Sequence, residues 1–353
     1  MYLRRSTTVK YFIAAFVGAV FYCECFIYMV QPTYWTDLDC KENDPTCTKI
    51  LFIADPQIQG DLAVPPPLSY LFNWDSDRYL KSTFSAVAQH FKPDVLVYLG
   101  DLMDEGSIAT MEQFHHYVKR LADIFDVYYQ VLQVWVPGDN DIGGEGEPIK
   151  HDKVAEFDKV FQQSSVIQYH NVSFFKVNAI TNKYPEVKYS VGPHQNLKIV
   201  VSHYPVTMRH QFGLKVYETI KPNIFFCAHD HESKYVKQSK VLEHRSTIRF
   251  NSPKSILNLS FDDDMLYEVY VPTCSYRMGT SYIGYGAAVL DNNNQQMRYT
   301  VFWSSTRFPY LILYAVILFI LLMYCLVFCA ARLIQGCKKN LVPADMSPLL
   351  QKI

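Results

Sequence analysis

Five short motifs in this chain of 353 residues carry side chains that can bind metal ions. The candidate ligands among their residues are three Asp, three His and one Gln, and each motif follows an apolar run. The motifs are Asp55-Pro-Gln57, Gly100-Asp101, Gly138-Asp139-Asn140-Asp141, Ser202-His203 and Ala228-His229-Asp230-His231. Two divalent cations about 3.5–4 Å apart can clamp a phosphate and activate an attacking water, and they need ligands of these types. The pattern therefore indicates two-metal phosphoester chemistry.

A structural explanation exists for each motif taken singly. An Asp that closes a strand usually caps a turn or a helix, and a lone buried His is usually a hydrogen-bonded core residue. Five such motifs in series, each after an apolar strand, are poorly explained in this way. We therefore favour the metal site.

The segments before the motifs have the length and composition of buried strands. They span residues 49–55, 94–101, 128–139, 197–203 and 223–229, and each ends in Asp or His. Helical spacing of apolar residues marks 79–91 and 107–125, and 247–304 has an all-β pattern with a predicted hairpin turn at 291–294. These elements predict a mixed α/β domain with its site at the carboxyl edge of the strands.

Two apolar stretches predict membrane helices at 11–30 and 308–331. Arg and Lys flank the outer end of each stretch, so we expect both termini in the cytosol. The predicted order is a cytosolic N-terminus (1–10), a span (11–30), a lumenal domain (31–307), a span (308–331) and a cytosolic tail (332–353). A cleaved signal peptide is the alternative for the first stretch. Glu24 lies within it, and we expect this residue at the lumenal edge or facing the other helix.

Other features fit a lumenal domain. Cys40 and Cys47 could form a disulfide in an oxidising compartment, with two free thiols as the alternative. Two sequons begin at Asn171 and Asn258. The formal net charge of -1 shows no excess of basic residues, so no nucleic-acid partner is expected.

In order and spacing, the motifs resemble those of the calcineurin-like metallophosphoesterases, across residues 49–231. The strings ADPQIQGD, YLGDLMDEG, VPGDNDIGG and SHYPV, with an apolar helix at each end, resemble the membrane-anchored branch that remodels GPI anchors. The resemblance implies an α/β fold, the four-layer αββα sandwich, flanked here by two transmembrane helices. It also implies that residues 247–304 complete the second sheet.

The resemblance implies a ligand set for two divalent ions, with Mn²⁺ expected and Zn²⁺ or Fe as alternatives. One ion is assigned to Asp55, Gln57, Asp101 and His231, and the other to Asp101, Asp139, His203 and His229. Asp101 bridges them.

The third motif also implies catalytic positions at Asn140 and Asp141. Three positions depart from the commonest pattern: Gln57 replaces His, Asp139 replaces Asn, and Asn140 replaces the His that contacts the phosphate and can protonate the leaving group. The motifs therefore support metal binding more strongly than turnover.

The expected function is a hydrolase that removes ethanolamine-phosphate from GPI anchors during transport from the endoplasmic reticulum to the Golgi. Membrane lipid and GPI-anchored glycoproteins are the expected partners. The alternative is a weak or inactive relative that acts as a cargo or glycolipid receptor. Asp345, Leu349 and Leu350 form an acidic dileucine pattern, which makes an endosomal or lysosomal membrane the alternative location.

Overall fold

A computed structural model describes residues 2–40, 47–186, 197–261, 264–290 and 296–340. The chain divides into two compact units. One unit runs from Phe26 to Thr306, and the other combines the segment up to Cys25 with the segment from Arg307. The predicted turn at 291–294 and the dileucine pattern at 345–350 lie outside the described residues.

The larger unit contains a six-stranded sheet in the order β10-β13-β12-β1-β2-β3. Strands β1, β2 and β3 are parallel, while β12 is antiparallel to both β1 and β13. The bounds are β1 Thr48–Ile53, β2 Val95–Tyr98, β3 Leu132–Trp135, β10 Leu257–Ser260, β12 Ile283–Leu290 and β13 Gln296–Ser304.

A second sheet has seven strands in the order β4-β5-β6-β7-β11-β8-β9. Its central strands β5, β6, β7 and β11 are parallel. The bounds are β4 Val166–Tyr169, β5 Val172–Lys176, β6 Leu197–Val201, β7 Ile224–Cys227, β8 Lys234–Ser239, β9 Ser246–Arg249 and β11 Met265–Tyr270.

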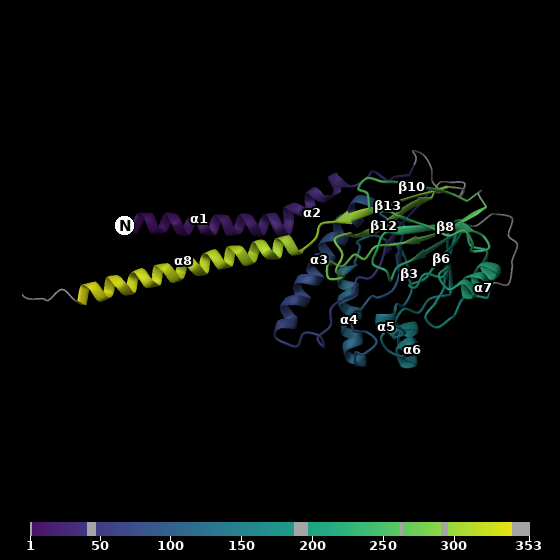
Figure 1. Ribbon diagram of the computed structural model, residues 1–353, viewed down its shortest axis with the longest axis horizontal. Coiled ribbons are helices and arrows are strands. Elements are labelled where there is room, and N and C mark those ends of the chain that lie inside the picture. Colours follow the sequence, from purple (N-terminus) through teal and green to yellow (C-terminus); the bar gives the residue numbers. More distant parts are fainter. Residues whose placement is uncertain (1, 41–46, 187–196, 262–263, 291–295, 341–353) are drawn as a thin grey trace, which may run out of the picture. The chain divides into compact units, whose positions relative to one another are not determined.

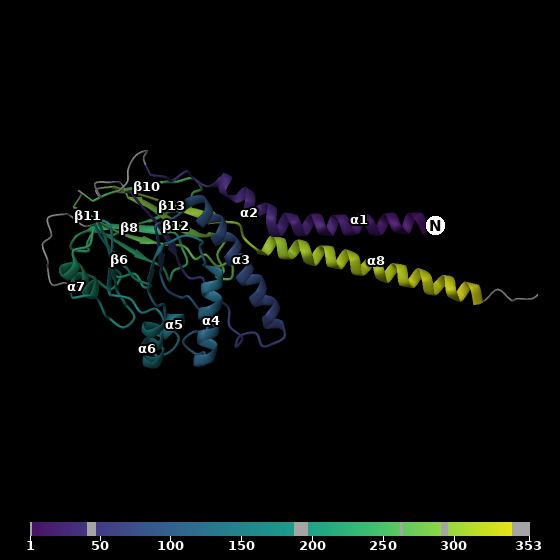
Figure 2. The ribbon, with the colours of Figure 1, turned by 180° about the vertical axis from the view of Figure 1, so that it is seen from behind.

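Helices cover the outer faces of the two sheets, with α3 and α4 on one side and α7 on the other (Figures 1 and 2). In this unit the helices are α2 Ile27–Val30, α3 Leu68–Phe91, α4 Met111–Ile124, α5 Asp139–Ile142, α6 His151–Val160 and α7 His210–Ile220, and a 3-10 turn spans Gln31–Tyr34. The sequence suggested a start at residue 79 for the first of the long helices, but α3 begins eleven residues earlier, directly after Pro67.

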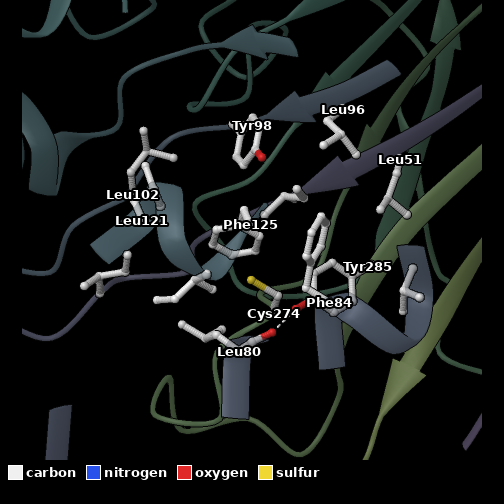
Figure 3. Packing of buried hydrophobic residues seen from close by; sticks show 14 of the residues in the cluster. Leu51, Leu80, Phe84, Leu96, Tyr98, Leu102, Leu121, Phe125, Cys274 and Tyr285 are labelled. Carbon is white, nitrogen blue, oxygen red and sulfur yellow. Dashed lines mark hydrogen bonds between the residues drawn. The ribbon is translucent and has the colours of Figure 1, made fainter. Parts of the chain in front are cut away.

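The layers follow from the alternation of side chains along each strand. In β1, Leu51 and Ile53 face α3 and α4, whereas Ile50 and Phe52 face the second sheet. The ring of Phe52 stacks on Phe226 of β7 at a centroid distance of 4.0 Å. Figure 3 shows the core beneath α3, where Phe84 and its neighbours pack against the six-stranded sheet. A third cluster joins α7 to the seven-stranded sheet, so the predicted αββα sandwich is confirmed.

The expectation that residues 247–304 complete the second sheet is wrong. Only β11 and the end of β9 from this region join the seven-stranded sheet, whereas β10, β12 and β13 extend the six-stranded one. Strand order is a long-range property, because each of these strands pairs with partners far away in sequence. The local alternation of residues could predict that the segment is β, but not which sheet it joins.

Two helices are long and apolar enough to cross a membrane, over Lys10–Tyr34 and Phe308–Gln335. The smaller unit holds the first of them as far as Cys25 and all of the second. The first is built from α1 Tyr2–Phe21 and a π-helical turn at Tyr22–Phe26, and it continues through α2; the second belongs to α8 Phe308–Asn340. Only 11% of the apolar window of the first and none of the second is buried by protein, unlike the core helices of a soluble domain.

The sequence left two positions open for Glu24, the lumenal edge or the side that faces the other helix. In the structure Glu24 faces the other helix of this unit. Its carboxylate accepts hydrogen bonds from Arg307 at 2.9 Å and from the Tyr314 hydroxyl at 2.5 Å. In the larger unit, Cys40 and Cys47 form the disulfide that the sequence left open.

Candidate metal centre

All five motifs lie at the carboxyl ends of parallel strands. Asp55, Asp101 and Asp139 follow β1, β2 and β3 of one sheet, whereas His203 and His229 follow β6 and β7 of the other. The two sheets pack face to face, so these strand ends meet at one edge of the sandwich. The fold thereby brings together side chains that are up to about half the chain apart in sequence.

The backbone around the motifs is bent in an unusual way. Five of the seven predicted ligands adopt the left-handed region, with φ of 47° at Asp55, 42° at Gln57, 49° at Asp101, 70° at His229 and 56° at His231. Non-glycine residues rarely adopt this conformation, and it persists only where the surrounding structure enforces it. Its concentration at one edge is a mark of a functional site.

Two glycines allow the motif loops to come close together. A Cβ on Gly138 would lie 2.1 Å from the Asp101 carboxylate and 2.2 Å from its backbone nitrogen. A Cβ on Gly100, which has a φ of +90°, would lie 2.8 Å from Nδ1 of His203. Only glycine fits at either position, which explains why Gly precedes Asp in the second and third motifs.

Asp139, His203 and His229 form one group whose ligand atoms all lie within 4.8 Å of one another. Oδ1 of Asp139 is 2.9 Å from Nε2 of His203 and 3.3 Å from Nδ1 of His229. On its other side, Nδ1 of His203 is 2.8 Å from the carbonyl oxygen of Leu99. The carbonyl can only accept, so Nδ1 carries the proton and Nε2 is left to bind a metal.

Asp55, Asp101 and His203 form a second group within the same distance. Nε2 of His203 is 3.4 Å from Asp101, so this histidine belongs to both groups, whereas the sequence assigned it to one ion. Gln57 completes the second group, since its amide nitrogen is 3.2 Å from Asp101 and 3.3 Å from Nε2 of His231. The structure therefore brings all seven predicted ligands together.

The surroundings of the Asp55 carboxylate show whether these residues are suited to bind a cation. It is fully buried, and within the described part of the chain neither carboxylate oxygen has a hydrogen-bond partner. An isolated buried carboxylate is expensive unless it is paired or binds a metal. Nδ1 of His203 lies 3.7 Å away but is directed to Leu99. The two orphaned oxygens are what a site for divalent cations requires.

The protonation of the metal-free site supports the same conclusion. Burial raises the pKa of Asp55 well above its usual value and also raises the pKa of Asp101. Burial alone would lower the pKa of His203, but the charges of Asp101, Asp139 and Asp55 raise it to about 10. A proton on His203 thus offsets part of the carboxylate charge, a task that bound cations would take over.

Asp141, which the sequence placed among the catalytic residues, has the contacts of a positioning residue. Its fully buried carboxylate accepts hydrogen bonds from the backbone N–H groups of Gly138, Met103 and Leu102, at 2.8, 3.0 and 3.2 Å. These bonds tie the second motif loop to the third. We therefore assign Asp141 to the support of Asp101.

Asn140 is directed at Asp101. Its backbone N–H donates to Oδ1 of Asp101 at 2.9 Å, and its side-chain amide donates to Oδ2 at 3.0 Å. A neutral amide has no acidic proton to transfer, so Asn140 orients the proposed bridging carboxylate instead of protonating a leaving group.

Two residues at the site were not singled out from the sequence. The ring of Tyr204 lies 4.3 Å from that of His229, and Arg277 donates to the backbone oxygen of Gln57 at 3.0 Å and to Asp104 at 2.7 Å. Tyr204 directly follows a predicted ligand, which is a signal that could have been used. Arg277 is distant from every motif in sequence and could only be found from the fold.

Comparison with known proteins agrees with this geometry. The family model for calcineurin-like phosphoesterase matches residues 48–233, which is more than half of the chain. The chain belongs to the calcineurin-like phosphoesterase family. It therefore carries the domain of a family of phosphoester hydrolases, and its Asp and His side chains form groups that could hold metal ions.

Similar proteins include Metallophosphoesterase 1 of Cricetulus griseus, 25% identical over 169 residues, or 46% of this chain and 42% of the relative. The Metallophosphoesterase 1 homolog of Drosophila melanogaster is 28% identical over 127 residues, or 35% and 33% of the two chains. The matches span less than half the length of these relatives. A solved metallophosphoesterase from Sphaerobacter thermophilus aligns over 72% of this chain and 88% of its own, with 12% identity and a TM-score of 0.37.

Proposed function

We propose that this protein is a metal-dependent phosphodiesterase. The observation that carries the proposal is the convergence of seven potential ligands, among them Asp55, whose buried carboxylate oxygens have no hydrogen-bond partner among the described residues. Asp55, Gln57, Asp101 and His231 would hold one divalent cation, and Asp101, Asp139, His203 and His229 the other. Bound at these positions, two cations would supply Lewis-acid polarisation of a phosphoryl group and activation of water.

The residues of the chain have separate tasks in this account. His203 is held by Leu99 in the tautomer that binds metal through Nε2. Asn140 and Gln57 donate to Asp101 and fix its carboxylate between the two ligand groups. Asn140 stands at the position of the usual proton donor and has no acidic proton, so the reaction favours a substrate whose leaving group needs little protonation or receives it from water.

For the substrate, we propose a phosphodiester on a membrane-linked glycan, with ethanolamine-phosphate on a GPI anchor as the specific case. The supports are the resemblance of the motif strings to the GPI-remodelling branch and the two helices that are long enough to cross a membrane. We further propose a secretory-pathway membrane as the location, with residues 31–307 in the lumen and both termini in the cytosol. Mn²⁺ is the proposed metal, because the amide of Gln57 suits a hard cation better than zinc.

Hydrolysis by the purified full-length chain tests the proposal. We expect cleavage of an aryl phosphodiester that requires added Mn²⁺ and is lost with a chelator and in Asp101→Asn. The matched control is Asp264→Asn, which neutralises an exposed carboxylate away from the motifs. Purified GPI anchors should lose one ethanolamine-phosphate, as read by mass spectrometry. Cleavage that is equal in wild type and Asp101→Asn would contradict the proposal.

The second candidate function is a receptor for cargo or glycolipid, and Asn140 is the observation that favours it. If the site has lost activity, Asp139→Asn with Asn140→His would return a proton donor and raise hydrolysis of a diester with a poor leaving group, by up to about 10²–10⁴-fold. In an adapted enzyme the same change should leave the rate level or lower it. No hydrolysis by either protein, with metals bound, would favour the receptor.

A further inference from the structure

The start of α3 shows a reversed distribution of polar and apolar side chains. Its first turns bury Ser69, Asp75 and Ser76, and Tyr276 donates a hydrogen bond to Asp75 at 2.9 Å. The large apolar side chains of the same turns and of the preceding loop are between 46% and 66% exposed. We name this set the α3 patch; it consists of Leu62, Leu68, Tyr70, Leu71, Phe72 and Trp74. A helix on the surface of a soluble domain shows the opposite pattern.

The α3 patch has no charged residue of its own, although the Arg78 guanidinium lies over the Trp74 ring at 5.1 Å. No charged residue occurs between Leu62 and Trp74, a stretch of thirteen residues that includes three consecutive prolines. Contiguous exposed apolar patches mark sites of contact with proteins or membranes. Trp and Tyr among aliphatic residues are typical of a surface at the level of lipid headgroups.

The topology of the sheet places the α3 patch at the same edge as the metal centre. Helix α3 connects the parallel strands β1 and β2, so it begins at their carboxyl edge, where Asp55 and Asp101 lie. The patch comprises the first two turns of this helix and the end of the loop that follows Gln57. The loop that carries two predicted ligands, Asp55 and Gln57, therefore leads directly into the patch.

The last strand before the C-terminal apolar segment, β13, ends at this edge of the sheet as well. Strand β13 runs parallel to β1, because both pair antiparallel with β12. Gly286 pairs with both Phe52 and Val301, so these two residues lie at the same level of the sheet. Three residues further along each chain, Ser304 therefore lies at the level of Asp55. The apolar span begins at Phe308, and four residues of chain reach at most about 14 Å. Only three residues therefore separate this end of the sheet from the start of the apolar segment.

We propose that the α3 patch inserts into the interfacial layer of the bilayer that holds the chain, and so presents the metal centre to phosphodiesters on lipid-linked molecules. The substrate part of this inference rests on the proposed function, whereas the lipid contact does not. Interfacial binding of this kind scales with the apolar area that enters the boundary between headgroups and acyl chains. The two apolar segments flank the domain in the sequence, at Lys10–Tyr34 and Phe308–Gln335, so a bilayer that holds both would also be available to the patch.

Trp74 is a natural reporter for this contact. The chain has four tryptophans, so the difference in emission between wild type and Trp74→Phe isolates the signal of this residue. We would reconstitute the full chain into phosphatidylcholine vesicles whose lipids carry bromine at a shallow acyl position. The inference predicts strong quenching of the Trp74 signal by these lipids and little quenching by aqueous acrylamide.

The matched control is Tyr128→Trp in the Trp74→Phe background. Tyr128 is 82% exposed and lies between α4 and β3, at the opposite edge of the sheet. The introduced ring should respond to acrylamide and not to brominated lipid. Leu71→Trp in the same background gives a second reporter in the α3 patch and should behave like Trp74.

The outcomes separate this inference from the proposed function, because quenching needs no turnover. Quenching by lipid with no hydrolysis would overturn the function and support the contact. Quenching of both patch reporters by acrylamide alone would overturn the contact. Protection from both quenchers would show that a protein partner or a second copy covers the patch, and would also overturn it.

Discussion

At the scale of single residues, the metal centre is a compromise between stability and function. Asp55 is buried without hydrogen bonds to its carboxylate from the described residues, and Asp101 shares its surroundings with two further carboxylates. Such an arrangement destabilises the metal-free fold, because a buried charge without a partner loses its hydration and gains little in return. Cations that bind only to the folded state would offset this loss of stability.

Asp55→Asn should therefore have opposite effects on binding and on metal-free stability. We expect the variant to lose at least one metal ion per chain, because an amide is a weaker ligand than a carboxylate. In the presence of a chelator it should be more stable than wild type, by about 1–3 kcal/mol, since the buried charge is gone. Thermal unfolding in detergent, with and without chelator, measures both effects. A variant that is less stable than wild type under both conditions would show that Asp55 is structural.

At the scale of elements, the site depends on loops that leave five strands and approach one another closely. Three of the loops bend through left-handed residues. Asp141 accepts hydrogen bonds that link the second and third motif loops, and Arg277 donates hydrogen bonds that link the first and second. These contacts lie outside the set of ligands. The precision of the site therefore depends on the packing of loop backbones as much as on the ligands themselves.

Gly138→Ala tests this dependence without altering a ligand. The added methyl would overlap the carboxylate and the backbone nitrogen of Asp101. We expect loss of metal and a free energy of unfolding lower by about 1–3 kcal/mol, the usual cost of overpacking. Gly146→Ala is the matched control, because no atom lies within 4 Å of its Cβ position. Metal content equal to wild type in Gly138→Ala would contradict the close approach of the two loops.

Glu268 of β11 supports the segment that follows His203. Its buried carboxylate accepts a hydrogen bond from the backbone N–H of Thr207 at 3.0 Å and another from the Thr207 hydroxyl. Burial raises the pKa of Glu268, and these hydrogen bonds and the nearby Arg245 oppose the rise only in part. The folded state thus keeps the proton to a higher pH than the unfolded state does.

This shift predicts how stability depends on pH. The contribution of Glu268 is largest below its ordinary pKa of 4.5, and it falls as the pH rises towards the higher pKa of the folded state. Glu268→Gln cannot titrate, so its stability relative to wild type should increase over that pH window and then level off. Unfolding measured across a pH series checks this. A constant difference between the two proteins would show that the pKa of Glu268 is the same in both states.

The sequence could predict the ligands because each motif is local. An apolar run followed by Asp55 or by His203 carries both the strand and the ligand, and a parallel arrangement brings the strand ends to one edge. Pairings that link distant segments left no such signal. Three features follow from the fold alone. Strand β12 lies beside β1, Arg277 donates a hydrogen bond to the backbone oxygen of Gln57, and His203 belongs to both ligand groups.

At the scale of the whole molecule, one folded unit is bounded on both sides by apolar helices. Glu24 pairs with Arg307 within the helical unit, which reduces the cost of a carboxylate in an apolar span. The domain between the helices exposes both sequon residues, Asn171 beside β5 and Asn258 in the edge strand β10. Exposure is what a glycan acceptor requires in a lumenal domain.

The topology predicts a glycan on Asn171, Asn258 or both. Treatment with an amidase that removes N-glycans should increase the gel mobility of the wild-type chain expressed in animal cells. Asn171→Gln with Asn258→Gln should abolish that change. In sealed microsomes, protease should cleave tags at both termini. Protected termini would show the reverse orientation. A chain with no glycan at either position would contradict the prediction of a glycosylated lumenal domain.

The binding of metal through Asp101 is the central claim, and metal content is its most direct measurement. Elemental analysis of the purified full-length chain should find two divalent ions per wild-type chain after incubation with Mn²⁺. It should find one or none in Asp101→Asn, because the proposed ligand set of each ion includes this carboxylate, and two in the control Asp264→Asn. The same metal content in wild type and Asp101→Asn would contradict the account.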